Sequence, residues 1–386
     1  MQPLIFTQNE LFKWEDKYYA PYAMKSKHSK GRKYSEKEHI YRSIYQRDRD
    51  RIIHSAAFRR LEYKTQVFVY HEGDYYRTRL THTLEVVQIA KTICKILRLN
   101  EELVEAIALA HDLGHTPFGH AVENTLNNLT KEEGGFNHNR QGLRVVELLE
   151  ERYPNFKGLN LSYETLEGII RHTPNLDILD DKLKKDFSDP QPTLETQVMD
   201  LADEIAYDNH DLDDGLKSEM LDEEMLRKIT LWKLTEKKIK KQYSNLKKNL
   251  KIYLIIRSLI DLEVTDIIKT SQFRIKKYKI CNFMDAKQCK DRIISFSEEV
   301  LQLRKELKDF IFKNLYCHWR VLRMSNKASR YIEALFNVYV NNPQLLPYKF
   351  QNKKEIKRSV CDYIAGMTDR YALEEYKRLF DPDTKV

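Results

Sequence analysis

Glycine and proline are scarce in this sequence. Its 386 residues include only 11 Gly and 10 Pro, so the chain has few of the residues that mark turns. Leu, Ile, Glu and Lys are abundant, and segments that alternate apolar and polar residues are hard to find. This composition favours long helices and predicts an all-α fold.

The cysteine patterns of a zinc ribbon or a disulfide framework are also missing. The five cysteines contain no CxxC pair, and their number is odd. We therefore expect buried or inert thiols. The residues are Cys94, Cys281, Cys289, Cys317 and Cys361.

Long uncharged segments are absent as well. No stretch approaches the ~20 apolar residues that a membrane-spanning helix needs. The N-terminal sequence MQPLIFTQNELFKWEDK has acidic residues and no apolar core of the signal-peptide type. We expect a soluble, cytoplasmic protein with no membrane partner.

The chain is basic, with a formal net charge of +8 and a pI of about 8.9. A positive balance suits anionic partners such as nucleotides or nucleic acid. Much of the excess lies in residues 227–251, where basic and apolar residues recur at helical spacing. Two interpretations stay open for this stretch: the solvated face of a helix, or a surface for a polyanion such as single-stranded nucleic acid.

The sequence HDLGH, which begins at His111, is the most informative feature. His111 and Asp112 follow the apolar stretch AIALA, and burying two polar side chains there is costly unless they are paired or bind a metal. His82 lies on the preceding amphipathic segment, which we expect to be helical over 79–98. One such histidine alone is more often a satisfied core residue. The cluster predicts a site for one divalent metal ion, such as Mn²⁺, Mg²⁺, Fe²⁺ or Ni²⁺.

A further ligand must come from a distant carboxylate. Asp203 is the best candidate, because it lies among apolar positions of a helix expected over 194–211. Asp200 is the rival, since it lies three residues earlier on nearly the same face. Two imidazoles and two carboxylates leave metal positions open for water or substrate, as a catalytic site requires.

Three other side chains are placed to help catalysis. His120 and Glu123 share one face at a helix start, and a carboxylate beside an imidazole makes an acid/base pair. Arg79 lies one turn before His82 and has the planar fork that binds phosphate oxygens. The alternative interpretation of the His120–Glu123 pair is a local surface contact.

Tyr207 and Asp211 follow Asp203 at four and eight residues, on one helix face. An aromatic ring and a carboxylate there are suited to pack against a sugar and accept its hydrogen bonds. Ordinary helix packing is the alternative interpretation of both residues.

At these residues the chain resembles the HD-domain deoxynucleoside triphosphate triphosphohydrolases, the bacterial dGTPase-like group in particular. The resemblance covers residues 40 to 220 closely and the rest more loosely. An HD pair alone is not specific, but the combination of motifs is. The matching stretches are RDRDRIIHSAAFRRLEYKTQVF, YRTRLTHTLEV, EAIALAHDLGHTPFGHAVE, GGFNHNRQ, YETLEGIIRHTP and VMDLADEIAYDNHDLDDGL. Thr116 stands where many relatives have proline, a departure that should not affect the chemistry.

The resemblance implies an HD-domain helical bundle with additional C-terminal helices. We therefore expect an N-terminal arm over residues 1–40, a metal-dependent phosphohydrolase core over 41–220, and a mostly helical C-terminal region over 221–386 packed on the core. Relatives form homo-oligomers, usually hexamers or tetramers, and several are activated by nucleotides at separate sites.

Carried over residue by residue, the resemblance also implies functional roles. It favours Asp203 over Asp200 as the fourth metal ligand. The implied metal ligands are His82, His111, Asp112 and Asp203. The implied catalytic residues are His120, Glu123 and His115. The implied substrate-binding residues are Gln66 near the sugar and base, Arg79 and His138 at the phosphates, and Tyr207 and Asp211 at the deoxyribose.

The family reaction cleaves between the α-phosphate and the sugar 5′ oxygen of a deoxynucleoside triphosphate, yielding a deoxynucleoside and tripolyphosphate. We expect this reaction here, with a dGTP-like substrate. Two alternatives are another HD-domain nucleotidase or phosphodiesterase, and a nucleic-acid-binding protein with a vestigial HD site.

Overall fold

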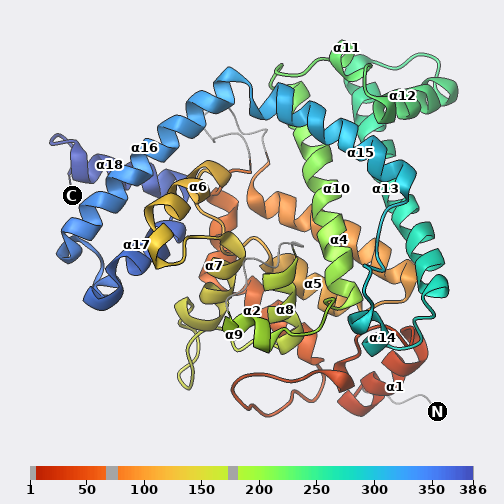
Figure 1. The fold of residues 1–386 in the computed structure, drawn as a ribbon, viewed down its shortest axis with the longest axis horizontal. Coiled ribbons are helices and arrows are strands. Elements are labelled where there is room, and N and C mark those ends of the chain that lie inside the picture. The colour runs from red at the N-terminus through yellow and green to blue at the C-terminus, as the bar shows by residue number, and fades with distance from the viewer. Residues whose placement is uncertain (1–5, 67–76, 173–180, 386) are drawn as a thin grey trace.

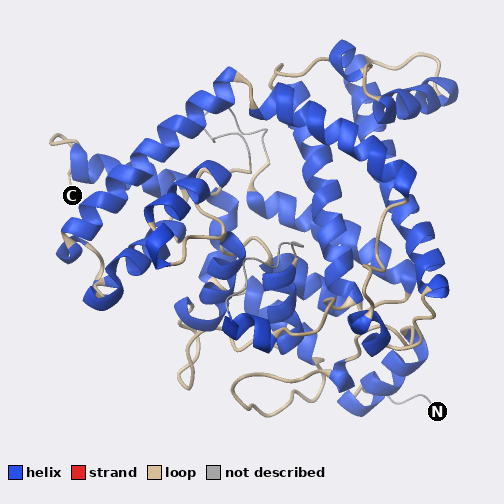
Figure 2. Ribbon diagram, viewed as in Figure 1, coloured by secondary structure: helices blue, strands red, loops and turns tan. Residues whose placement is uncertain are grey.

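The structure is a computed structural model that describes residues 6–66, 77–172 and 181–385. Within these ranges the regular elements are helices, joined by loops and a few isolated bridges, and there is no strand (Figure 2). The expected all-α fold is confirmed. None of the helices in these ranges combines the length and the apolar character needed to cross a membrane.

The helices form one N-terminal and one C-terminal series (Figure 1). The first series comprises α1 (Gln8–Tyr18), α2 (Ile44–Ile53), α3 (Ala56–Arg60), α4 (Arg79–Leu97), α5 (Glu101–Ala110), α6 (His120–Leu129), α7 (His138–Arg144), α8 (Tyr163–Arg171), α9 (Asp181–Asp186) and α10 (Leu194–Lys217). The second comprises α11 (Glu223–Leu226), α12 (Thr230–Gln242), α13 (Lys248–Lys277), α14 (Phe283–Gln288), α15 (Glu298–Ile311), α16 (Trp319–Asn341), α17 (Ile356–Ala365) and α18 (Asp369–Phe380). π-type turns, Val145–Leu149 and Phe312–Tyr316, follow α7 and α15.

The main apolar core forms where α4, α5 and α10 pack together. Each of these helices begins at a side chain that accepts a hydrogen bond from its first turn: Thr78, Asn100 and Thr193. Asn100 accepts from the amides of Glu102 and Leu103, as its position in the sequence predicts. These caps fix where the helices start, and therefore which faces meet in the core.

The helix α10 is longer than the sequence predicts. We expect an end near residue 211, but the helix continues to Lys217. Leu212 and Leu216 extend its apolar face into a second core, which is shared with α12, α13 and α15. The packing against these C-terminal helices favours the extra turns.

The C-terminal region packs on the N-terminal half at two places. Helices α13 and α15 lie beside α10, and α16 packs on α6 in a third core with α17 and α18. Arg304 on α15 clamps the first contact, because it pairs with Asp208 at 2.8 Å and Glu204 at 3.1 Å on α10 and with Glu263 on α13. The clamp holds α15 against the helix that carries Asp203.

The basic stretch 227–251 lies mostly on α12. Trp232 and Ile239 are buried on one face of that helix. Lys240 is exposed beside that face and pairs with Glu236 at 2.9 Å. This arrangement has the form of an amphipathic surface helix with part of its charge balanced locally.

The N-terminal segment, which the sequence predicts as an arm over residues 1–40, is described from residue 6 onward. Residues 6–40 contain α1 and pack in part on the same chain. Tyr19 is only 3% exposed and lies in the main core. Trp14 and Tyr18 stay 38% and 39% exposed. One part of this segment therefore packs into the core, and another part keeps its aromatic rings exposed.

All five cysteines are free. Cys94 and Cys361 are buried, as predicted, whereas Cys281 and Cys317 are exposed and Cys289 is intermediate. The thiols form no disulfide framework, in agreement with their spacing.

Candidate metal-dependent active site

Four side chains converge inside the bundle from three helices. His82 lies on α4, and His111 and Asp112 lie just beyond the end of α5; one ligand atom from each of these three lies within 4.8 Å of the others. Asp203 on α10 joins them, with Oδ1 2.9 Å from His82 Nε2 and 3.6 Å from His111 Nε2. Two imidazoles and two carboxylates therefore meet, although the chain separates them widely.

The end of α5 orients the first of the HD residues. His111 is the C-cap of that helix, and its Nδ1 donates to the Ala108 carbonyl oxygen at 2.6 Å. This bond leaves Nε2 as the ring nitrogen available to a metal ion. His111 Nε2 is buried and has no hydrogen-bond partner. An orphaned ring nitrogen beside two carboxylates fits the ligand set of a divalent metal ion.

The electrostatics of the cluster also suit a cation. Burial alone would raise the pKa of Asp112, but Arg79 and His111 outweigh burial and lower it to about 2. Asp203 has a pKa well below its usual range, because the nearby His111 and His82 overcome its burial. Burial would lower the pKa of His111, but Asp112 and Asp203 raise it to about 9. The interior thus holds two ionised carboxylates at one point.

The rival carboxylate Asp200 faces other surroundings. It pairs with Arg292, and burial raises its pKa to about 8 despite that partner. It does not line the cavity that contains Asp203. The geometry therefore favours Asp203 as the fourth ligand.

Arg79, at the start of α4, is only partly engaged. Its Nη1 donates to both oxygens of Asp112, at 3.0 and 3.1 Å. Its Nε and Nη2 are buried without a hydrogen-bond partner. The guanidinium thus holds a candidate metal ligand with one nitrogen and keeps two donors for an anion.

Glu123 joins two histidines rather than one. His120 begins α6 directly after Gly119, whose φ of 67° lies in the region that favours glycine. His120 Nδ1 is 3.1 Å from Glu123 Oε2. Glu123 Oε1 accepts from His138 Nδ1 at 2.8 Å and from its amide at 2.9 Å. Despite burial, these bonds hold the pKa of Glu123 well below its usual range.

His115 packs against this network. Its ring stacks on His138 with centroids 4.0 Å apart. Burial, then the charge of Arg79, lower the pKa of His115 well below its usual range. Ligand atoms of His115, Glu123 and His138 also lie within 4.8 Å of one another, so they form a second group with metal-binding composition. Because Glu123 already bonds two histidines, an acid/base network explains this group better.

Of the residues predicted to contact the sugar, Tyr207 and Gln66 line the cavity and Asp211 lies behind its wall. Tyr207 lines the cavity, with its ring 6.3 Å from that of His82 and 6.4 Å from that of His120. Asp211 does not line the cavity; it accepts a hydrogen bond from the Tyr316 hydroxyl. Gln66 lines the cavity and its Oε1 is buried without a partner.

A cavity of about 500 Å³ brings these groups together. Several of its lining residues were missed from the sequence. Lys308, Phe312 and Tyr316 come from α15 and the π-type turn after it, a region with no recognisable chemical motif. The clamp at Arg304 brings this segment to the cavity.

Two histidines were also missed. His172 lies 5.8 Å, ring to ring, from His111, and burial lowers its pKa to about 4. His210 Nδ1 is 3.2 Å from His82 Nδ1, and its other ring nitrogen pairs with Glu85. Both lie in stretches that resemble the family, which was the available signal. The contact with His210 at Nδ1 orients the ring of His82 and leaves its Nε2 facing Asp203.

Comparisons with known proteins agree with this geometry. The profile of the HD domain matches residues 79–208, and that of the phosphohydrolase-associated domain matches residues 294–378. The deoxyguanosinetriphosphate triphosphohydrolase-like proteins of Geobacter metallireducens and Geobacter sulfurreducens are each 50% identical over 370 residues, covering 95% of this chain and 96% of the relative. A protein of the same description from Ralstonia pickettii is 48% identical over 375 residues, with 94% and 95% covered. This chain therefore belongs to the HD-domain phosphohydrolases, in the deoxyguanosinetriphosphate triphosphohydrolase-like family.

Proposed function

We propose that this protein hydrolyses deoxynucleoside triphosphates to a deoxynucleoside and tripolyphosphate, using one divalent metal ion. The observation that carries the proposal is the single cavity that joins the four-ligand group, the two free donors of Arg79 and the ring of His120. The names of the relatives support the same substrate class.

We assign His82, His111, Asp112 and Asp203 as ligands of Mn²⁺, Mg²⁺, Fe²⁺ or Ni²⁺. A set of two nitrogens and two oxygens suits such ions. These four residues would hold the ion, which would supply polarisation of a phosphoryl oxygen and activation of water. The unpartnered His111 Nε2 supports this assignment.

The other residues act on the triphosphate and on protons. Arg79 binds phosphate oxygens through Nε and Nη2, and His115 and His138 lie along the phosphate chain. His120 transfers a proton through Nε2, because its Nδ1 is held by Glu123. The Arg79 cation and the imidazole donors around one polyanion stabilise the charge that develops during cleavage.

In this proposal, the sugar contacts one aromatic ring and one carboxylate. Tyr207 packs on the deoxyribose and leaves no room for a 2′-hydroxyl. Asp211 reaches the 3′-hydroxyl by exchanging its hydrogen bond from Tyr316 for one from the sugar. This arrangement would favour deoxyribonucleotides over ribonucleotides.

The test is an assay with each dNTP alone and in pairs, in Mn²⁺ or Mg²⁺, that measures both nucleoside and tripolyphosphate. Tripolyphosphate in equal amount to nucleoside supports the proposal, and turnover only in pairs identifies an activating nucleotide. Orthophosphate or a nucleoside monophosphate as product would instead identify a nucleotidase or phosphodiesterase. Absence of any metal-dependent turnover would point to a nucleic-acid-binding protein with a vestigial site.

A further inference from the structure

The turn before His120 has an unusual backbone. Phe118 and Gly119 follow each other with φ values of 58° and 67°, in the left-handed region that few residues other than glycine adopt. A backbone of this kind persists where the contacts around it hold it in place. The turn leads directly into His120, which lines the catalytic cavity. Whatever holds the turn therefore also places the group that we assign to proton transfer.

Contacts within the N-terminal half of the chain provide part of this hold. Thr116 Oγ1 donates to the Gly119 carbonyl oxygen at 3.0 Å. A Cβ on Gly119 would lie 3.3 Å from the Gln66 carbonyl oxygen, so the turn packs closely against the segment that carries Gln66. Neither contact involves the amide of Phe118, which finds its acceptor elsewhere.

The acceptor of that amide is the first residue of α18. Asp369 Oδ1 accepts from the Phe118 amide at 3.0 Å. Asp369 Oδ2 accepts from the amide and the hydroxyl of Thr65, at 3.1 and 2.6 Å. The residue is only 2% exposed. One buried carboxylate thus joins the turn before His120 to the residue that precedes Gln66.

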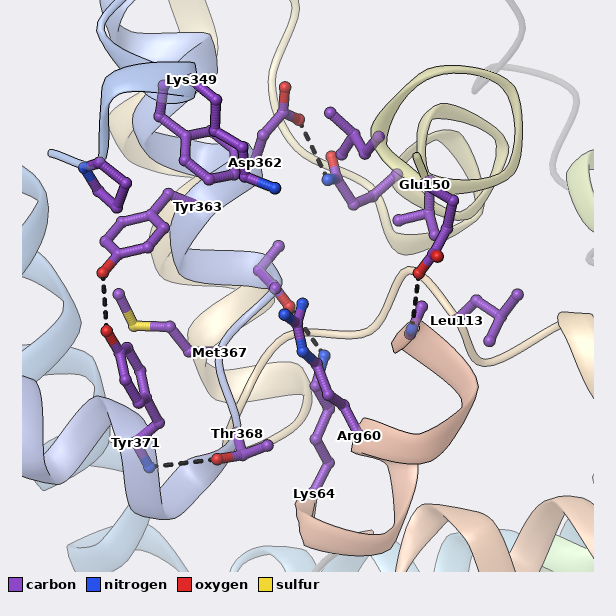
Figure 3. A pocket seen from close by; sticks show the side chains of 18 residues that line it. Arg60, Lys64, Leu113, Glu150, Lys349, Asp362, Tyr363, Met367, Thr368 and Tyr371 are labelled. Atoms are coloured by element: carbon purple, nitrogen blue, oxygen red, sulfur yellow. Dashed lines mark hydrogen bonds between the residues drawn. The ribbon is translucent and has the colours of Figure 1, made fainter. Parts of the chain in front are cut away.

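Lys64 makes a second connection at the same junction. Its Nζ donates to the His115 carbonyl oxygen at 2.5 Å and to the Ala365 carbonyl oxygen at 2.8 Å. Ala365 ends α17, and a short loop leads from it to Asp369. Figure 3 shows Lys64 and Thr368 of this loop from the side of a separate cavity that both residues line. The corner between α17 and α18 therefore contacts the segment that carries the active-site histidines at two points.

We propose that Asp369 is a positioning residue of the active site, through which the C-terminal helices fix the places of His120 and Gln66. The inference rests on the proposed function, because these two residues have their roles there. Asp369 does not line the catalytic cavity, so it acts only through the segments that it holds. Its Oδ1 bond bears on His120 and hence on turnover, whereas its Oδ2 bonds bear on Gln66 and hence on substrate binding.

An ordinary helix-capping role does not account for these contacts. Asp369 lies in the first turn of α18, where a carboxylate stabilises a helix. The cap itself is Thr368, whose hydroxyl accepts from the Tyr371 amide at 3.2 Å (Figure 3). Both oxygens of Asp369 instead accept from Thr65 and Phe118, about 250 residues or more away along the chain. The carboxylate therefore serves the active-site segments.

The test is Asp369→Ala, which removes both acceptor oxygens. The kcat for dGTP should fall about ten-fold or more and the KM should rise, because small displacements of catalytic and binding groups have large effects on rate. The matched control is Glu375→Ala on the same helix, which loses hydrogen bonds from Tyr339 and Tyr363 and so loosens α18 from α16 and α17. The control should keep the kcat and KM of the parent. Thermal unfolding and metal content of both variants record any general damage separately.

A double-mutant cycle with His120 separates positioning from a general loss of structure. In the His120→Ala background, Asp369→Ala should lower kcat little further, because the group that it positions is already absent. An equal fold-loss of kcat in both backgrounds, or a parental kcat in Asp369→Ala, would overturn the inference.

Thr65→Val provides a second variant in case Asp369→Ala does not fold. It removes only the hydroxyl that donates to Asp369 Oδ2 and leaves the bond to the Phe118 amide in place. The KM for dGTP should rise, and kcat should stay near that of the parent. A parental KM in this variant, or a fall in kcat alone, contradicts the proposed division between the two oxygens.

Hydrogen exchange gives a readout that does not depend on turnover. A peptide covering residues 116–123 should exchange at least about ten-fold faster in Asp369→Ala than in Glu375→Ala, because the Phe118 amide loses its buried acceptor. Equal exchange in the two variants would show that Asp369 does not hold the turn. If the parent does not hydrolyse dGTP, the proposed function fails, and this measurement still decides whether Asp369 holds the turn.

Discussion

Asp203 and Asp200 lie three residues apart on α10 but have different neighbours. Asp203 contacts His82 and His111, whereas Asp200 pairs with Arg292. Asp203→Ala should lose both bound metal and activity, while Asp200→Asn keeps the metal. Metal analysis of the purified variants, with folding checked by circular dichroism, makes the comparison. Metal retained in Asp203→Ala and lost in Asp200→Asn would mean that Asp200 is the ligand.

His120 is the exposed member of the network around Glu123, with 53% of its side chain accessible against 14% for His138. It is therefore best placed to exchange a proton with substrate or water. We expect His120→Ala to lower kcat by roughly 10²-fold or more, a general acid–base magnitude, with metal still bound. His54→Ala, at an exposed histidine beyond α2, is the control. Near-normal turnover of His120→Ala would shift the role to His115.

Tyr207 lines the catalytic cavity, and we propose it as one wall of the sugar pocket. If its ring crowds the 2′ position, the parent prefers dGTP to GTP, and Tyr207→Ala lowers that preference. The measurement is the ratio of kcat/KM for the two nucleotides in each protein. Tyr316→Phe is a useful companion, because it removes the hydroxyl that bonds Asp211 and keeps the ring. An unchanged ratio in Tyr207→Ala would remove this residue as the sugar gate.

At the scale of elements, the N-terminal segment is fastened to the core through buried carboxyl groups. Glu195, at the start of α10, accepts from the amides of Met24 and Asn100, each at 3.0 Å. Glu15 on α1 holds the Ser26 amide at 2.8 Å. Burial raises the pKa of both carboxyl groups to about 7, although these hydrogen bonds oppose the shift.

The raised pKa of Glu195 sets the direction of a pH effect. A carboxyl group whose folded pKa exceeds its unfolded value stabilises the fold fully below about pH 4.5, and this contribution is lost as pH rises through about 7. The loss is on the order of 3 kcal/mol. Chemical denaturation should therefore show Glu195→Gln gaining stability relative to the parent between these pH values. A difference that stays flat with pH contradicts the assignment.

At the scale of the whole molecule, large apolar side chains stay exposed around the turn after α15 and the start of α16. Phe312 is 62% exposed, Trp319 57% and Leu322 53%. Such residues are enriched at interfaces, and together with Trp14 they favour assembly. We expect a homo-oligomer, a hexamer or a tetramer, in light scattering at micromolar concentration. A mass near 46.2 kDa would refute assembly.

The sequence by itself determined the features that depend on near neighbours. Helical periodicity and the scarcity of glycine and proline gave the all-α fold, and Asn100 marked a helix start. His111 is next to Asp112, and His120 is one turn from Glu123, so local geometry alone brings each pair together. These contacts follow from the spacing of the residues along the backbone and do not depend on how the helices pack.

Only the tertiary structure decided contacts between distant segments. Asp200 and Asp203 share nearly one helix face, and the packing of α4 and α5 against that face gives Asp203 the two histidines. His138, at the start of α7, is a second hydrogen-bond partner of Glu123. Tyr316 lines the cavity because the pair of Arg304 with Asp208 holds α15 and the turn after it against α10. The described part of the N-terminal segment, residues 6–40, is held to the core in part by buried Glu195, which accepts a hydrogen bond from the Met24 amide. Spacing in the sequence does not encode these contacts, since each depends on which helix faces are buried together.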